Sequence, residues 1–148
     1  MTHKRFRKEH IVTSVVAVIV DDRERVLLTK RSIPPFKDLW VMPGGKIDLG
    51  EPIVVALKRE VDEEVGLAVE VGDLIDVFEH VTPGEENNHY IILFYRCWPV
   101  HTAVNHNQDE VAEAEWVPRH ELARYPMPEG TRHILTKLFP DLACPLGP

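Results

Sequence analysis

Several features that mark other protein classes are missing from this sequence. It has only two cysteines, Cys97 and Cys144, which lie far apart and form no C-x-x-C pair. Neither a disulfide framework nor a cysteine-rich metal site is therefore expected. Basic residues are also in deficit, because the formal net charge is -7, and this argues against a nucleic-acid-binding or anionic-membrane-binding surface. No apolar run reaches the roughly 20 residues that span a bilayer.

The N-terminal stretch superficially resembles a secretion signal. The basic MTHKRFRKEH precedes the apolar IVTSVVAVIV. However, the apolar run continues directly into DDRER without a small-residue cleavage site, and its Val, Ile and Thr residues favour a strand. We therefore expect a buried first strand and, with so few cysteines, a protein of the reducing cytoplasm.

The remaining composition is that of an ordinary globular domain. Hydrophobic residues make up 44% of the chain and charged residues 28%, and no internal repeat is visible. A chain of 148 residues buries about two thirds of its unfolded surface, which holds a fold together without disulfides or a structural metal. We expect one domain over residues 1–148.

Turn-forming residues divide the chain into short apolar segments. Residues 11–20 and 25–30 are expected to form a hairpin. The proline-rich segment 31–38 is expected to be a loop, and the PGG that follows 39–42 a turn. The other expected elements are strands at 67–71, 74–81, 89–98 and 114–118, an acidic loop at 106–115 and a closing helix at 132–139. Strands before, between and after helices predict an α/β sandwich with a mixed sheet covered on both faces.

A central helix is expected from Pro52 to Val65. Apolar residues recur every four positions from Ile53 onward, as on one face of a helix. Pro52 suits the first helical position, where its missing N–H costs nothing, and Gly66 suits the left-handed residue just beyond the end.

This helix carries four acids in five positions: Glu60, Asp62, Glu63 and Glu64. Like charges three or four residues apart repel by roughly 0.2–0.5 kcal/mol per pair, and Glu60 forms two such pairs. Glu60, Glu63 and Glu64 fall within an arc of roughly 100° beside the apolar stripe. One explanation is a solvated acidic face. The other is a divalent cation such as Mg²⁺ or Mn²⁺, which binds carboxylate oxygens and reverses the repulsion.

Residues before and within the helix favour the cation. Gly44 and Gly45 allow the backbone to approach a ligand closely and leave carbonyl and N–H groups to point at metal or phosphate. Glu51, at the helix entry, is suited to accept backbone N–H bonds, and Arg59 to pair with a neighbouring acid. Together these residues predict a divalent-metal site.

One long pattern joins the glycine pair to the end of the helix. It runs Gly45, five residues, Glu51, seven residues, Arg59-Glu60-Val61, one residue, Glu63-Glu64, one residue, Gly66-Leu67. This pattern resembles the Nudix hydrolase signature at every fixed position, and the preceding LWVMPGG is similar to the family's lead-in. The resemblance implies an α/β/α sandwich with a mixed sheet between helices. It also implies metal-dependent hydrolysis of a nucleoside diphosphate linked to another moiety.

The resemblance further implies which residues bind metal. Glu60 and Glu64 are the implied principal ligands of Mg²⁺ or Mn²⁺, joined by Glu63 and by the Gly44 carbonyl. These are oxygen donors of the kind that hard cations prefer.

Other residues are implied to support or complete the catalytic machinery. Glu51 and Arg59 are the implied supports. Some family members activate the attacking water with a glutamate from a later loop, and the sequence leaves the choice open among three candidates, Glu110, Glu113 and Glu115.

Candidate substrate contacts lie around the glycine pair. They are Arg31, whose guanidinium matches phosphate geometry, Lys46 and the backbone of Gly45. Pro83 lies sixteen residues beyond Leu67, the spacing that marks ADP-ribose pyrophosphatases in the family, although Pro before Gly is also ordinary turn chemistry. In contrast, HYIILFY is similar to the matching strand of members that act on nucleotide sugars. The ten residues before the first strand are fewer than ADP-ribose enzymes often carry.

The favoured function is therefore cleavage of ADP-ribose or a nucleotide sugar into a nucleoside monophosphate and a phosphorylated product. One alternative is a nucleoside triphosphate pyrophosphohydrolase that removes damaged nucleotides. Another is a non-catalytic Nudix-like module that senses a ligand, although such modules usually have a damaged motif and an attached DNA-binding domain. We expect a monomer or homodimer with no nucleic-acid or membrane partner.

Overall fold

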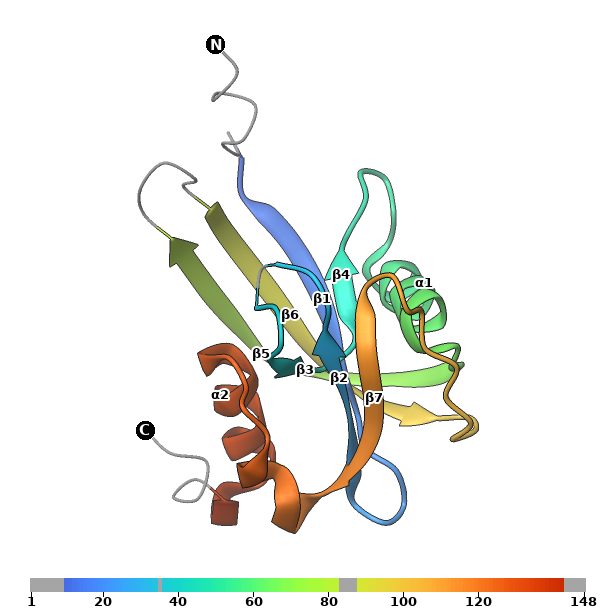
Figure 1. Cartoon of the computed structure of the whole chain (residues 1–148). Helices are drawn as coiled ribbons and strands as arrows, with labels where there is room; N and C mark the ends of the chain where they lie inside the picture. Colours follow the sequence, from blue (N-terminus) through green and yellow to red (C-terminus); the bar gives the residue numbers. More distant parts are fainter. Residues whose placement is uncertain (1–9, 35, 83–87, 143–148) are drawn as a thin grey trace.

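The computed structural model describes residues 10–34, 36–82 and 88–142. Within these residues, seven strands form two sheets, and two α-helices pack against them from opposite sides (Figure 1). Pro83, whose spacing favours ADP-ribose, and Cys144 lie outside the described residues. The expected α/β sandwich with a mixed sheet is confirmed, although a second, smaller sheet accompanies the mixed one.

The larger sheet has the order β4 (Gly44–Lys46), β1 (Val12–Ile19), β6 (Asn88–Pro99) and β5 (Val69–Thr82). β1 runs parallel to β6, whereas β4 pairs antiparallel with β1 and β5 pairs antiparallel with β6. The smaller sheet is antiparallel, with the order β3 (Trp40–Val41), β2 (Arg25–Arg31) and β7 (Val111–Pro118).

The helices are α1 (Ile53–Val65) and α2 (Glu129–Leu138), with short 3-10 turns at Arg119–Arg124 and Pro140–Leu142. None of the helices in the described residues combines the length and apolar character needed to cross a membrane.

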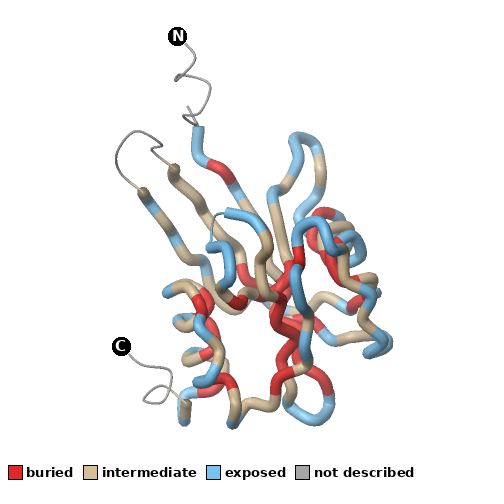
Figure 2. The backbone as a smooth tube through the Cα atoms, in the orientation of Figure 1, coloured by how far each residue is buried: buried red, intermediate tan, exposed pale blue. Residues whose placement is uncertain are grey.

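From Val15 onward β1 is largely buried on both faces, which explains the apolar run Val15–Ile19. Val15 and Ile19 belong to the core that contains Leu57 of α1. The alternate residue Val18 belongs to a second core, which contains Ile134 of α2. Buried residues accordingly gather in the middle of the molecule, between the two helices (Figure 2). β1 therefore packs against α1 and also pairs with β4.

The glycine pair does not form the expected turn. Gly44 and Gly45 lie in β4 and pair with Val16 and Val15 of β1. A side chain at position 44 would overlap the carbonyl of Val15 and the backbone of Val16. Glycine therefore serves close approach of two strands here, and not chain reversal.

Two further strand predictions are wrong at their boundaries. The expected break at 72–73 is absorbed into β5 as a local irregularity in register, where the Trp98 ring lies against Gly72. The expected acidic loop ends earlier than residue 115, because β7 begins at Val111, which pairs with Arg31 of β2. Both boundaries are set by partner strands far away in the sequence.

The expected hairpin forms only at its closed end. Val20 and Val26 make an isolated antiparallel bridge, and β1 and β2 then enter different sheets.

The ends of the helices follow local signals. α1 begins at Ile53 with Pro52 as its N-cap, one residue later than expected, and Gly66 is left-handed as predicted, with φ of 67°. α2 begins at Glu129 and not at residue 132, because the extended Pro128 acts as its N-cap.

Candidate active site

Arg59 organises the acidic residues around the start of α1. Its Nε and Nη2 donate to the two carboxylate oxygens of Glu51 at 2.6 and 3.0 Å, a bidentate pair. Its Nη1 donates to Glu60 at 3.1 Å and to Glu63 at 3.2 Å. Nη2 also donates to the backbone carbonyl of Lys46 at 3.2 Å, which ties the helix to β4.

Glu51 fixes the loop that leads into α1. Its carboxylate accepts the backbone N–H of Asp48 at 3.0 Å, and its own N–H donates to the Asp48 carbonyl at 2.9 Å. The bonds from Arg59 hold the pKa of Glu51 below its ordinary value. Glu51 is thus an ionised structural anchor, as its place at the helix entry predicts.

Glu64 is the most buried acid on the helix, with 9% of its surface exposed. Burial raises its pKa to about 8, and the charge of Glu60 adds to this effect. The Gly44 N–H donates to its carboxylate across a long 3.4 Å. A carboxylate this buried with so little compensation is a strong binding position for a cation.

Glu60 is affected by burial in the same direction as Glu64. Burial raises the pKa of Glu60, opposed by the charge of Arg59. Gly45 makes room for this carboxylate, because a side chain at position 45 would overlap it. The glycine pair therefore brings strand backbone directly against both acids, Gly44 against Glu64 and Gly45 against Glu60.

Glu110 joins the site from a distant part of the chain. Its charge raises the pKa of both Glu60 and Glu64. The segment before it is tied to the end of α1, because the Asn105 and Asn107 N–H groups donate to the carbonyls of Val65 and Glu64 at 2.9 and 2.8 Å.

The other two candidate bases are directed elsewhere. Glu113 lies in β7 with its carboxylate 3.8 Å from the Lys30 ammonium. Glu115 accepts a hydrogen bond from the Tyr125 hydroxyl at 3.2 Å. Ala114 and Trp116, between and after them, pack on the core beneath α1, so in a strand the two glutamates project from the opposite face.

The predicted substrate contacts are placed unequally. Arg31 lies at the end of β2, and its positive charge lowers the pKa of Glu64. The guanidinium of Arg31 therefore acts on the acidic group. Gly45 lines the site through its backbone. Lys46 has an exposed side chain, and only its carbonyl is bound by Arg59.

The oxygen donors of this site are of the kind that binds a divalent cation, but their side chains do not converge on one point. Glu64, which is buried, and Glu60, which is partly buried, are hard oxygen donors, and burial raises the pKa of both carboxyl groups. Among the described residues, however, no three acidic, histidine or cysteine side chains converge closely enough to hold an ion. Glu60 and Glu63 instead share Nη1 of Arg59. These two contacts are the ones that a bound cation would replace, while the bidentate pair with Glu51 keeps Arg59 in place.

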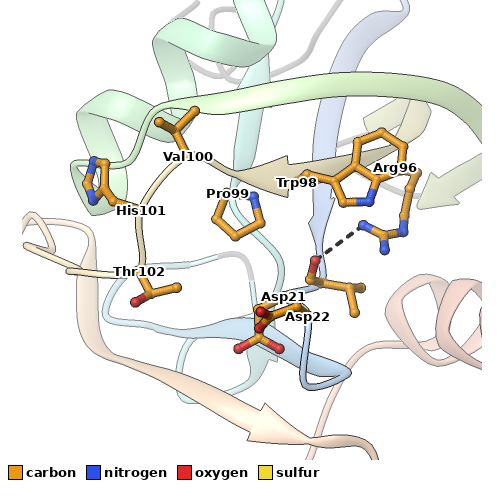
Figure 3. Close-up of a pocket in the computed structure, with 9 residues that line it drawn as sticks. Asp21, Asp22, Arg96, Trp98, Pro99, Val100, His101 and Thr102 are labelled. Carbon is orange, nitrogen blue, oxygen red and sulfur yellow. Dashed lines mark hydrogen bonds between the residues drawn. The ribbon is translucent and has the colours of Figure 1, made fainter.

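A cavity of about 520 Å³ lies at the opposite end of β1 from β4, between the β1–β2 turn and residues 96–102 (Figure 3). Two of its charged groups, Asp21 and Arg96, are already engaged. The Asp21 carboxylate accepts from Arg25 Nε at 2.7 Å and from two backbone N–H groups. Arg96 donates to the carbonyls of Val20 and Cys97 at 3.4 and 2.6 Å. These contacts hold the turn, so the cavity is not the candidate active site.

The sequence analysis did not identify the residues that hold the segment around Glu110. Asn107 and Ser32 make the contacts around Glu110, and the Asn105 N–H binds the end of α1. The available signal was local: Asn followed by Gln-Asp is typical of a turn in which the side chain binds the backbone. Nothing local indicates that this turn lies against α1.

The family can now be assigned. The model of the NUDIX domain matches residues 10–138, and the chain belongs to the Nudix family. Hydrolases of this family generally use divalent metal ions. A crystal structure of a MutT NUDIX hydrolase from Burkholderia pseudomallei has a TM-score of 0.80 and 30% identity, with 88% of this chain and 99% of that one covered.

Relatives named for different activities match over most of the chain. The human 8-oxo-dGDP phosphatase NUDT18 is 31% identical over 118 residues, covering 80% of this chain and 35% of that protein. The ADP-ribose pyrophosphatase of Methanocaldococcus jannaschii is 29% identical over 106 residues, covering 72% of this chain and 62% of that protein. This chain therefore spans about a third of the human relative's length, and the relatives do not share one substrate.

Proposed function

We propose that this protein is a divalent-metal-dependent pyrophosphohydrolase. Its substrate is a nucleoside diphosphate linked to another moiety, which it cleaves into a nucleoside monophosphate and a phosphorylated product. The observation that carries the proposal is the pair of carboxylates on α1, the buried Glu64 and the partly buried Glu60, held against the backbone of Gly44 and Gly45. Arg59 pairs with Glu60 but is shared with Glu51 and Glu63. A carboxylate pair that is compensated only in part suits an Mg²⁺ or Mn²⁺ ion, which in turn binds the diphosphate.

In the proposed site each residue has a distinct task. Glu60 and Glu64 hold the metal, with Glu63 and the Gly44 carbonyl as further donors. When bound, the metal supplies positive charge that stabilises the leaving phosphate oxygens. Arg59 and Glu51 keep the helix and the β4 strand in register, through the bidentate pair and the Lys46 carbonyl. Arg31 contacts the diphosphate from the β2 side.

Glu110 is the proposed general base. It accepts a proton from the water, whose oxygen attacks one phosphorus, and the bridging oxygen leaves with the other phosphate. One electrostatic influence and two contacts favour Glu110 over its rivals. Its charge acts on Glu60 and Glu64, whereas Glu113 is paired with Lys30 and Glu115 is bound by Tyr125.

ADP-ribose or a nucleotide sugar is the first substrate to test. The ADP-ribose pyrophosphatase relative supports this choice. A second candidate is a damaged nucleotide, which the 8-oxo-dGDP phosphatase relative supports and which needs the same metal site. A cytoplasmic location, a single domain over 1–148 and a monomeric or homodimeric state stay predictions.

A substrate panel tests the proposal. Wild type, Glu64→Gln and the control Asp62→Asn are incubated with Mg²⁺ and ADP-ribose, several nucleotide sugars, nucleoside triphosphates or 8-oxo-dGDP, and products are separated by ion-exchange chromatography. We expect one class to be cleaved, with at least 1,000-fold less turnover in Glu64→Gln. Asp62 is an exposed acid of the same helix, so Asp62→Asn should stay within twofold of wild type. No cleavage of any compound, or equal rates in all three proteins, would overturn the proposal.

A further inference from the structure

The position of Glu110 depends on a short segment outside the family motif. Residues 105–110 connect the region after β6 to β7, and the segment contacts α1 through its backbone. The N–H groups of Asn105 and Asn107 bind the carbonyls of Val65 and Glu64. These are among the last carbonyls of α1, which have no partner within a helix. The segment therefore caps the helix that carries the buried acids.

Asn107 is the residue at which this cap turns toward Glu110. Its side-chain oxygen Oδ1 accepts the N–H of Asp109 at 2.9 Å, closing a tight turn. Its carbonyl accepts the N–H groups of Glu110 and Val111 at 3.3 and 2.9 Å. Asn107 thus binds the backbone of Glu64 and also the backbone of Glu110 and of its two neighbours, Asp109 and Val111.

Ser32 holds the same turn from the opposite direction. Its Oγ donates to the Asp109 carbonyl at 3.1 Å, and its N–H donates to the Glu110 carbonyl at 3.1 Å. Ser32 follows β2 directly after Arg31. The backbone of Glu110 is therefore held between α1, through Asn107, and the end of β2, through Ser32.

We propose that Asn107 is a positioning residue, whose side chain folds the turn that holds the backbone of Glu110 beside the end of α1, next to the backbone of Glu64. This inference rests on the proposed function and on Glu110 acting as the base. Small displacements of a base from the attacking water reduce turnover steeply, because proton transfer requires hydrogen-bond contact. The side chain of Asn107 acts on rate through Glu110 and does not touch substrate.

The direct test compares Asn107→Ala with a matched control, Asn105→Ala. Both residues cap α1 through a backbone N–H, which each variant keeps, but the Asn107 side chain alone of the two binds the turn among the described contacts. We expect Asn107→Ala to lower kcat at least tenfold with KM within twofold, and Asn105→Ala to stay within twofold in both. Asn107→Asp keeps an acceptor oxygen and should return kcat to within threefold of wild type.

Two further readouts separate positioning from loss of fold. Mn²⁺ affinity by titration calorimetry should stay within twofold in Asn107→Ala, because Glu60 and Glu64 are unchanged. The double variant Glu110→Gln with Asn107→Ala should be no slower than Glu110→Gln alone, since Asn107 acts only through Glu110. Additive losses, or a rate loss that follows weakened Mn²⁺ binding, would overturn the role.

The outcomes also distinguish this inference from the function on which it rests. If the wild type cleaves no diphosphate compound, the proposed function fails. If Glu110→Gln keeps the wild-type kcat, the assignment of the base fails. If Glu110→Gln is slow while Asn107→Ala matches Asn105→Ala, the function stands and the positioning role of Asn107 is wrong.

Discussion

The two halves of the candidate site are built in different ways. One half consists of α1 and of β4, the strand before it. Arg59, Glu60 and Glu64 lie within a stretch of six residues of α1, and Glu51 lies just before the helix begins. The other half is Glu110 with the ends of β2 and of α1 around it, assembled from segments up to 77 residues apart. The first half can be recognised from a continuous sequence pattern, whereas the second exists only once the sheets have formed.

This difference has a physical origin. Helical periodicity fixes which side chains share a face, so the acids and Arg59 on α1 meet by local geometry. Glu110 reaches them because Asn107 binds the end of α1 and Ser32 binds the turn from β2. In the proposed function the first half binds the metal, and the second half positions the base that activates the water.

The largest effect after that of Glu64→Gln is expected where the two halves meet, at Glu110. Glu110→Gln should lower kcat by about 100-fold or more, the usual range for loss of a general base. Glu113→Gln and Glu115→Gln should stay within about threefold, because these acids are bound to Lys30 and Tyr125. Steady-state kinetics on the cleaved compound provides the measurement. A slower Glu113→Gln than Glu110→Gln would reverse our assignment of the base.

A smaller effect is expected inside the first half. Gly45→Ala places a methyl group where it overlaps the Glu60 carboxylate, and such overpacking costs about 1–3 kcal/mol of unfolding free energy. Urea denaturation is the measurement, with Lys46→Ala as the control because that side chain is exposed. Equal stability of Gly45→Ala and wild type would show that Glu60 moves aside freely.

A third expected effect is a pH slope in stability. Between the ordinary value of 4.5 and the folded pKa of about 8, Glu64 binds a proton in the folded protein but not in the unfolded chain. The metal-free protein should therefore lose stability as pH rises across this window, at up to about 1.4 kcal/mol per pH unit. Urea midpoints in EDTA should show the slope, and Glu64→Gln should reduce it. A slope of opposite sign in the wild type would mean that Glu64 is ionised when buried.

The fold and the first half of the site follow largely from sequence. The spacing of apolar residues from Ile53 to Val65 predicted α1, and Gly66 predicted its end. Both signals depend only on residues close together in the sequence. The glycine pair was mistaken for a turn, since its true role is contact with Val15 and Val16 of β1. The choice of Glu110 among three acids required the register of β7, which turns Glu113 and Glu115 to the other face. Such information lies in pairing between distant strands.

The central claim is that the buried acid pair on α1 binds a divalent cation, and Mn²⁺ titration tests it most directly. Water proton relaxation would follow Mn²⁺ binding to the wild type, Glu64→Gln and Asp62→Asn at pH 8. We predict one saturable class of binding in the wild type and Asp62→Asn, weakened at least tenfold in Glu64→Gln. Equal Mn²⁺ affinity in all three proteins, or no binding to the wild type, would contradict the assignment of Glu60 and Glu64 as the metal site.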